Sequence, residues 1–124
     1  MKEDLLILYQ EVQNLIRKYE NPLVVKVNQE GRYELWTNKK AVIEGRKMDG
    51  IHFASAVIQS HYVGFYFMPV YIKPELKEEI GLDLLKTLKG KSCFQFKKND
   101  SEMMDQIEKI LAIGFQFYQK QGWV

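Results

Sequence analysis

The fold of this 124-residue chain is decided by residues 49–68, which read DGIHFASAVIQSHYVGFYFM. Two runs rich in β-branched and aromatic residues, 51–59 and 62–68, flank the polar pair Ser60-His61. Such runs favour extended strands, and a tight turn at Ser60-His61 would pair them antiparallel. The expected pairs are Ile58 with Val63, Ala56 with Phe65 and Ala54 with Phe67. Small side chains would then alternate with large ones on one face, as in a packed core.

The dipeptide Asp49-Gly50 predicts another hairpin just before this pair of strands. Asp-Gly suits the two-residue type I′ turn, whose central residues need positive φ. The turn would join a strand over residues 41–48 to the strand over residues 51–59. The opposed pairs would be Met48 with Ile51, Arg46 with Phe53, Glu44 with Ser55 and Val42 with Val57.

These two hairpins give the predicted sheet a second face that is rich in apolar side chains. It would carry Phe53, Val57, Tyr62, Tyr66, Met68 and Val70, mixed with Glu44, Arg46, Ser55 and Gln59. A sheet face that water covers is mostly polar. We therefore expect another segment of the chain, a second copy or a ligand to cover it. The candidate contact residues are Phe53, Val57, Tyr62, Tyr66, Met68 and Arg46.

The flanking segments complete an α+β pattern. Apolar residues at helical spacing predict a first helix that ends before Asn21-Pro22, since the residue before proline avoids helical geometry. Strands over 23–27 and 32–37 follow. Gly81 then divides residues 75–80 from 82–88, which predicts two short helical pieces or one kinked helix, and a strand over 92–97 comes next. Asn99 and Glu102 form a capping-box pattern for a final helix. The order α-β-β-β-β-β-α-β-α predicts one domain, residues 1–124, with an antiparallel sheet and helices on one face.

Composition narrows the classes of partner. Eighteen Lys and Arg against sixteen Asp and Glu leave a formal charge of +2, so nucleic acid is not a favoured partner. The lysines of residues 86–98 surround Phe94 and Phe96, but acidic segments flank that patch on both sides. No apolar run reaches the roughly 18 residues that span a bilayer, so no membrane partner is expected. The single thiol, Cys93, suits a reducing cytoplasm.

Catalytic chemistry has a weak basis in the sequence. Cys93 with His52 or His61 would make a thiol–imidazole pair, but a lone cysteine in a strand is more often a small buried hydrophobe. Neither histidine has an acid at a diagnostic spacing. The sequence therefore favours a non-enzymatic protein that needs no cofactor.

Helix carboxylates provide one alternative. Asp4 and Glu11 lie in the first helix, and Glu102 and Asp105 lie in the last. Oxygen-rich surfaces of this kind bind hard cations or iron. Acids near a helix N-terminus also occur simply because they favour the helix dipole.

Three segments resemble the YdhG-like domain family, a bacterial family long described as a domain of unknown function. They are HYVGFYFMPVY at 61–71, LKGKSCF at 88–94, and the closing Gly114-Phe115, Tyr118 and Gly122-Trp123-Val124. Some members of the wider family are called frataxin-like iron chaperones and have an α/β sandwich fold. The resemblance thus implies an α+β sandwich and an iron-delivery role.

Together these patterns predict a cytoplasmic, non-enzymatic binding domain. Its aromatic sheet face would bind a partner protein, a small ligand or a second copy of the chain as a homodimer. The alternative is a frataxin-like carrier that holds iron through Asp4, Glu11, Glu102 and Asp105.

Overall fold

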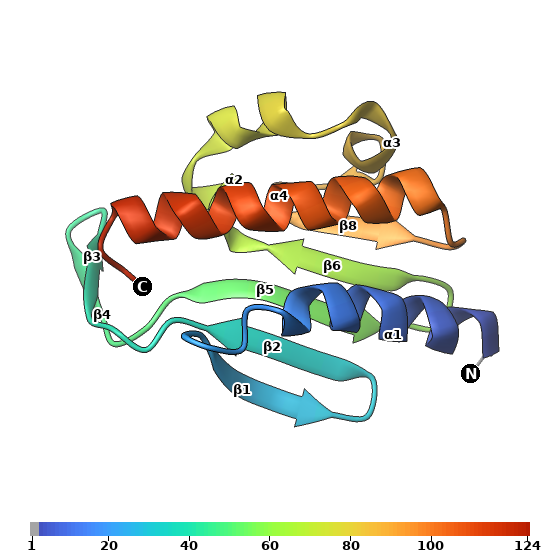
Figure 1. Cartoon of the computed structure of the whole chain (residues 1–124), viewed down its shortest axis with the longest axis horizontal. Helices are drawn as coiled ribbons and strands as arrows, with labels where there is room; N and C mark the ends of the chain where they lie inside the picture. The colour runs from blue at the N-terminus through green and yellow to red at the C-terminus, as the bar shows by residue number, and fades with distance from the viewer. Residues whose placement is uncertain (1–2) are drawn as a thin grey trace.

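The computed structural model describes residues 3–124 and is an α+β fold, as the sequence predicts (Figure 1). Six strands form an antiparallel sheet in the order β1-β2-β5-β6-β8-β7, and β3 and β4 form a separate two-stranded hairpin. The elements are α1 (Glu3–Arg17), β1 (Val24–Gln29), β2 (Arg32–Trp36), β3 (Ala41–Ile43), β4 (Arg46–Met48), β5 (His52–Ile58), β6 (Val63–Phe67), α2 (Met68–Ile72), the 3-10 helix η1 (Pro74–Glu79), α3 (Leu82–Leu85), β7 (Leu88–Lys89), β8 (Cys93–Phe96) and α4 (Ser101–Lys120).

The β5–β6 hairpin has the predicted register. Ala54 lies opposite Phe67, Ala56 opposite Phe65 and Ile58 opposite Val63. The two alanines leave room for the phenylalanine rings beneath the helices, and all four of these side chains are fully buried. This complementarity of small and large side chains explains why the turn at residues 59–62 forms without a glycine.

The hairpin predicted at Asp49-Gly50 is wrong. The turn lies at Glu44-Gly45, where φ is 51° and 77°, and residues 41–48 fold back on themselves. Because β3 pairs with β4, neither of these strands reaches β5, and β2 takes that place in the sheet. The four cross-strand pairs expected from that turn, including Arg46 with Phe53, are therefore absent from the described β5 ladder.

Thr37 joins the two ends of the segment between β2 and β5 that contains the β3–β4 hairpin. Its backbone N–H donates to the Ile51 carbonyl at 2.8 Å, and its hydroxyl oxygen accepts from the Ile51 N–H, also at 2.8 Å. Gly50 packs directly on Thr37, since a Cβ on Gly50 would lie 2.8 Å from the Thr37 carbonyl oxygen. The glycine that suggested a turn is needed for close backbone approach.

A β-bulge moves Phe53 to the opposite face from the one predicted. Leu35 pairs with Ala54, but the next residue of β2, Trp36, pairs with His52, so Phe53 is the extra residue in β5. Its ring is fully buried, 5.4 Å from the ring of Tyr118 between centroids. The Tyr118 hydroxyl also donates to the His52 carbonyl at 2.6 Å, so α4 supports the bulge from the core side.

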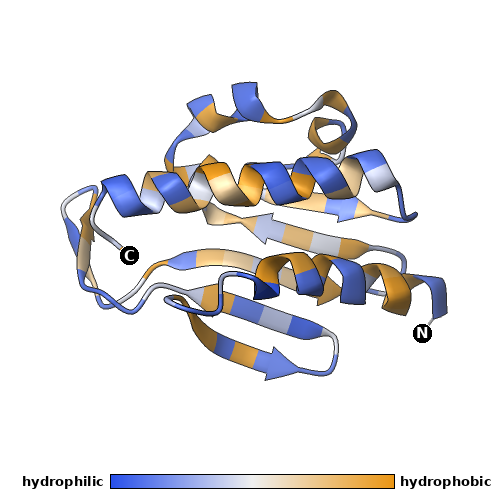
Figure 2. Ribbon diagram, in the orientation of Figure 1, coloured by the Kyte–Doolittle hydropathy of each residue, from blue (hydrophilic) through white to orange (hydrophobic). Residues whose placement is uncertain are grey.

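Helices α1 and α4 lie side by side over one face of the sheet (Figure 1). Both alternate between hydrophobic and hydrophilic residues along their length, as amphipathic helices do (Figure 2). Gly114 of α4 lets the helix approach the sheet, because a Cβ there would lie 2.4 Å from the Phe67 ring. The N-cap of α4 is Asp100, which accepts from the N–H groups of Glu102 and Met103, rather than the expected Asn99.

Between β6 and β7 the chain forms α2, η1 and α3. Strand β6 ends at Phe67, since Pro69 lies in the first turn of α2 and cannot donate to a strand ladder. Val70 is therefore buried in the core cluster and does not lie on the second sheet face, where it was expected. Gly81 separates η1 from α3, as predicted. Within residues 3–124, no helix is both long enough and apolar enough to cross a membrane.

Candidate functional site

The sheet face opposite α1 and α4, here called the outer face, carries side chains that alternate with the core residues of the same strands. The ladders place these side chains in register across four strands. One row is Glu34, Ser55, Tyr66 and Cys93, and the next is Arg32, Val57, Gly64 and Gln95. Trp36 and His52 form the start of a third row. The outer face is thus an ordered arrangement of polar and aromatic groups.

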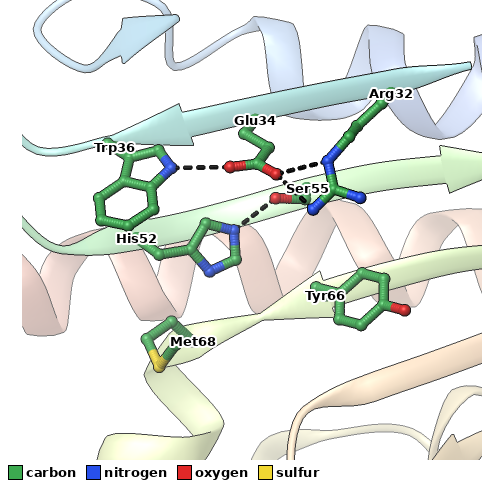
Figure 3. A pocket seen from close by; sticks show the side chains of 7 residues that line it. All are labelled: Arg32, Glu34, Trp36, His52, Ser55, Tyr66 and Met68. Atoms are coloured by element: carbon green, nitrogen blue, oxygen red, sulfur yellow. Dashed lines mark hydrogen bonds and ion pairs between the residues drawn. The ribbon is translucent and has the colours of Figure 1, made fainter. Parts of the chain in front are cut away.

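A cavity of about 260 Å³ lies in this face. Seven side chains line it: Arg32, Glu34, Trp36, His52, Ser55, Tyr66 and Met68. They come from three adjacent strands and the first residue of α2, and Figure 3 shows them in front of the strands with α4 behind. The rings of Trp36 and His52 lie 5.5 Å apart at one end. A concave site with aromatic walls and a few fixed polar groups is typical of a binding pocket.

Glu34 organises one side of the cavity. Its Oε2 accepts from Arg32 Nε at 2.7 Å, and its Oε1 accepts from Trp36 Nε1 at 3.0 Å. Burial favours the protonated carboxyl, but these hydrogen bonds and the charge of Arg32 outweigh burial and hold the pKa of Glu34 below its usual value. The carboxylate is therefore ionised at neutral pH, and it fixes the Arg32 and Trp36 side chains.

His52 and Ser55 form the other hydrogen-bonded pair, through His52 Nε2 and Ser55 Oγ (Figure 3). Burial lowers the pKa of His52 to about 4, although the negative charge of Glu34 opposes this shift. The imidazole is therefore neutral at pH 7, and a neutral ring offers one donor and one acceptor nitrogen. The cavity presents hydrogen-bonding groups at this end and no extra charge.

A serine beside a histidine also occurs in hydrolases, so the rest of the arrangement matters. In that mechanism a carboxylate orients the histidine, and N–H groups stabilise the oxyanion. Here both carboxylate oxygens of Glu34 accept from Arg32 and Trp36. The Ser55 side chain lies mid-strand and is only 3% exposed. Among residues 3–124, no hydrogen bond joins Glu34 to His52, so the described pair is not oriented by a carboxylate as it is in that mechanism.

The sequence-predicted contact residues do not all lie together. Tyr66 and Met68 line the cavity. Val57 lies on the outer face beside Arg32, at 5% exposure, and Tyr62 lies half-buried where the chain enters β6. Phe53 belongs to the core because of the bulge, and Arg46 lies in the separate β3–β4 hairpin.

The site also contains Arg32, Glu34 and Trp36, which sequence reasoning did not select, together with Ser55, which it placed on this face without choosing it as a contact, and His52, which it considered only as a partner of Cys93. A usable signal was the alternation of polarity in residues 32–36, where the core residues Tyr33 and Leu35 lie between three polar or amphipathic ones. That alternation indicates a shared face, but not which strand lies next to it. The β2–β5 pairing and the bulge were needed to bring His52 beside Trp36.

The thiol–imidazole pair is not assembled at the outer face. Cys93 lies on β8 beside Tyr66, and His52 lies on β5, so strand β6 separates them. Burial, and to a smaller extent the neighbouring Cys93 side chain, raises the pKa of the Tyr66 phenol. His61 is exposed in the β5–β6 turn. Phe94 and Phe96, the aromatics of the lysine-rich patch, are buried in the core and do not offer stacking surfaces.

The carboxylates of the iron hypothesis lie on the two long helices. Asp4 borders a surface cavity with Lys97 and Lys98, and Glu102 and Asp105 are exposed near the start of α4. Glu11 is half-buried in α1. Within residues 3–124, no three His, Cys, Asp or Glu side chains are grouped so that they could hold a metal ion. Iron binding stays a prediction, and anaerobic calorimetric titration with ferrous iron tests it.

No family model, no curated protein and no solved structure matches this chain. The YdhG-like resemblance therefore stays a prediction that rests on the quoted segments. The α+β class with an antiparallel sheet is established by the structure itself.

Proposed function

We propose that this chain is a non-enzymatic binding domain whose outer face binds a small molecule in the cavity between Trp36 and Tyr66. The observation that carries the proposal is the preorganised cavity, in which seven side chains from three adjacent strands and α2 meet and three hydrogen-bonded pairs order five of them. Preorganisation lowers the entropy that binding loses, because the side chains are already ordered. A cytoplasmic location, which suits the free thiol of Cys93, belongs to the same proposal.

The size and charge of the cavity define what it would accept. Ligand pockets commonly enclose roughly 300–1,000 Å³, so a cavity of about 260 Å³ suits a group of about one or two rings. Arg32 and Glu34 neutralise each other, and His52 is neutral. An uncharged planar group would stack on Trp36 and contact the His52 ring beside it.

Nuclear magnetic resonance with indole as the probe tests this function. We expect titration of the ¹⁵N-labelled chain to shift the Trp36 indole N–H signal and the amides of β2, β5 and β6. Trp36→Ala should abolish the saturable shifts, because the stacking surface is gone. Tyr71→Ala is the matched control, since Tyr71 is an aromatic residue of α2 that is 52% exposed outside the cavity. Shifts that centre elsewhere, or that survive Trp36→Ala, would contradict the proposal.

A second copy of the chain is the other occupant that the sequence suggested for this face. Light scattering over a range of concentrations separates the two cases, and the proposal expects a monomer whose mass does not change on Tyr66→Asp. A dimer that Tyr66→Asp dissociates would show that the outer face is buried by self-association instead.

A further inference from the structure

A second cavity is linked to the first one by a contact between Lys26 and Trp36. It encloses about 460 Å³ and is lined by Lys26, Arg46, Lys47, Met48, Asp49 and Gly50. Lys26 comes from the edge strand β1, and the other residues come from β4 and the loop that follows it. The second cavity therefore lies where the β3–β4 hairpin meets the edge of the sheet.

One contact joins the two cavities. The Lys26 ammonium lies 4.7 Å from the centroid of the Trp36 ring, and Trp36 lines the first cavity while Lys26 lines the second. The Thr37–Ile51 hydrogen bonds lie one residue beyond Trp36 and His52, and they hold the base of the hairpin beside the first cavity. A single ligand of modest length can thus reach both.

The two cavities differ in charge. The first holds one cation and one anion, Arg32 and Glu34, which pair at 2.7 Å. The second has three cations, Lys26, Arg46 and Lys47, against one carboxylate, Asp49. The salt bridges found among residues 3–124 use none of those three cations. The second cavity therefore has positive charge that an anionic group would neutralise.

We propose that the ligand joins an uncharged planar ring to an anionic group, a carboxylate or a phosphate. The ring occupies the cavity at Trp36, and the anion lies among Lys26, Arg46 and Lys47. This inference rests on the proposed function, because it names the class of ligand for the same face. The cations are solvent-exposed, so their attraction for the anion is modest and weakens as salt screens it.

Two pairs of probes test the inference and distinguish the two anions. Indole-3-acetate is compared with indole, and adenosine monophosphate is compared with adenosine, by the same resonance titration at low salt. We expect at least one anionic member to bind about tenfold more tightly than its uncharged partner, and added sodium chloride to reduce that ratio. If only the carboxylate probe or only the phosphate probe binds more tightly than its uncharged partner, that result identifies the anion and supports the inference.

Charge reversal tests whether the anionic group binds at the second cavity. The double substitution Arg46→Glu with Lys47→Glu should remove the advantage of the anionic probe and leave binding of the uncharged probe unchanged. Lys39→Glu with Lys40→Glu is the matched control, because it changes net charge equally at exposed positions that do not line the second cavity. Lys26→Met is a single substitution on β1 that tests the same cavity without altering the hairpin.

The outcomes distinguish failure of this inference from failure of the proposed binding function. Equal affinity within both pairs, with shifts still centred on Trp36, overturns the anionic class and leaves the binding function standing. An anionic advantage that the Lys39 and Lys40 reversal removes as fully as the Arg46 and Lys47 reversal assigns the effect to net charge and also overturns the inference. Absence of saturable shifts with all four probes overturns both.

Discussion

The two faces of the central sheet use the same strands for different purposes. On the helix-covered face, Ala54 and Ala56 lie against Phe65 and Phe67, and these side chains are completely buried. On the outer face, the alternate residues Ser55 and Tyr66 lie in register with Glu34, and hydrogen bonds join Glu34 to Arg32 and Trp36 and join Ser55 to His52. The first face is held by apolar burial, and the second by polar pairs.

This difference shows how the sheet separates stability from recognition. Apolar burial is not directional, so it can fix the layers without fixing the orientation of each side chain. Hydrogen bonds have preferred directions, so the Glu34 and His52 pairs determine how Trp36 and Ser55 are presented. The outer face can therefore be preorganised by interactions that contribute less to stability than the core does.

The largest expected effect on stability comes from a substitution on the helix-covered face. Phe65→Ala removes a ring that lies 5.5 Å from Phe67 and 5.7 Å from Phe94 between centroids. The lost burial and the resulting cavity should lower the free energy of unfolding by about 3–5 kcal/mol. Tyr66→Ala, at the neighbouring position on the outer face, is the comparison and should cost much less. Urea denaturation measures both, and equal losses would contradict the division of roles.

An intermediate effect comes from pH at the outer face. The folded pKa of His52 is about 4, against about 6.5 in an unfolded chain, so between these values only the unfolded chain takes up the proton. Stability should fall as the pH drops from about 6.5 to 4, with His52 contributing about 3 kcal/mol of the loss. His52→Gln should flatten this part of the profile. His61→Gln, at an exposed turn residue, should not, and the hypothesis fails if both variants keep the slope of the wild type.

The smallest expected effect sharpens the role of the Glu34 network. Glu34→Gln removes the charge that holds Arg32 and weakens the acceptor for Trp36, which should cost about 1–2 kcal/mol of stability. Glu30→Gln, at the exposed turn between β1 and β2, is the control and should be close to neutral. The Trp36 indole N–H signal should also move, since its acceptor changes. An unchanged signal would mean that Glu34 does not position the ring in solution.

Several elements could be predicted from local pattern. The β5–β6 register follows from alternation, because a shift by one residue would turn every apolar side chain to the wrong face. The two long helices follow from apolar spacing, and the division at Gly81 from the glycine itself. Tyr66 and Met68 were selected from the same alternation, and both line the cavity.

Other features depend on competition between turns. Asp49-Gly50 and Glu44-Gly45 are both compatible with a tight turn, and residues 41–48 can pair with β5 or with themselves. Strand β2 takes the position beside β5, since its Tyr33 and Leu35 then enter the core opposite Ala56 and Ala54. Local propensity cannot predict this choice, because the burial that favours β2 involves residues far apart in the sequence.

The sequence alone determined the class of fold, the pairing of β5 with β6, and the presence of aromatic side chains on a second sheet face. These depend on periodicity and on neighbours along the chain. Only the tertiary structure decided that Phe53 enters the core and that His52 pairs with Trp36 on the outer face. It also decided that Arg46 and Lys26 line the same cavity. The physical reason is that a bulge and a strand order are set by packing between distant segments, where burial of a large ring outweighs the alternation of one strand.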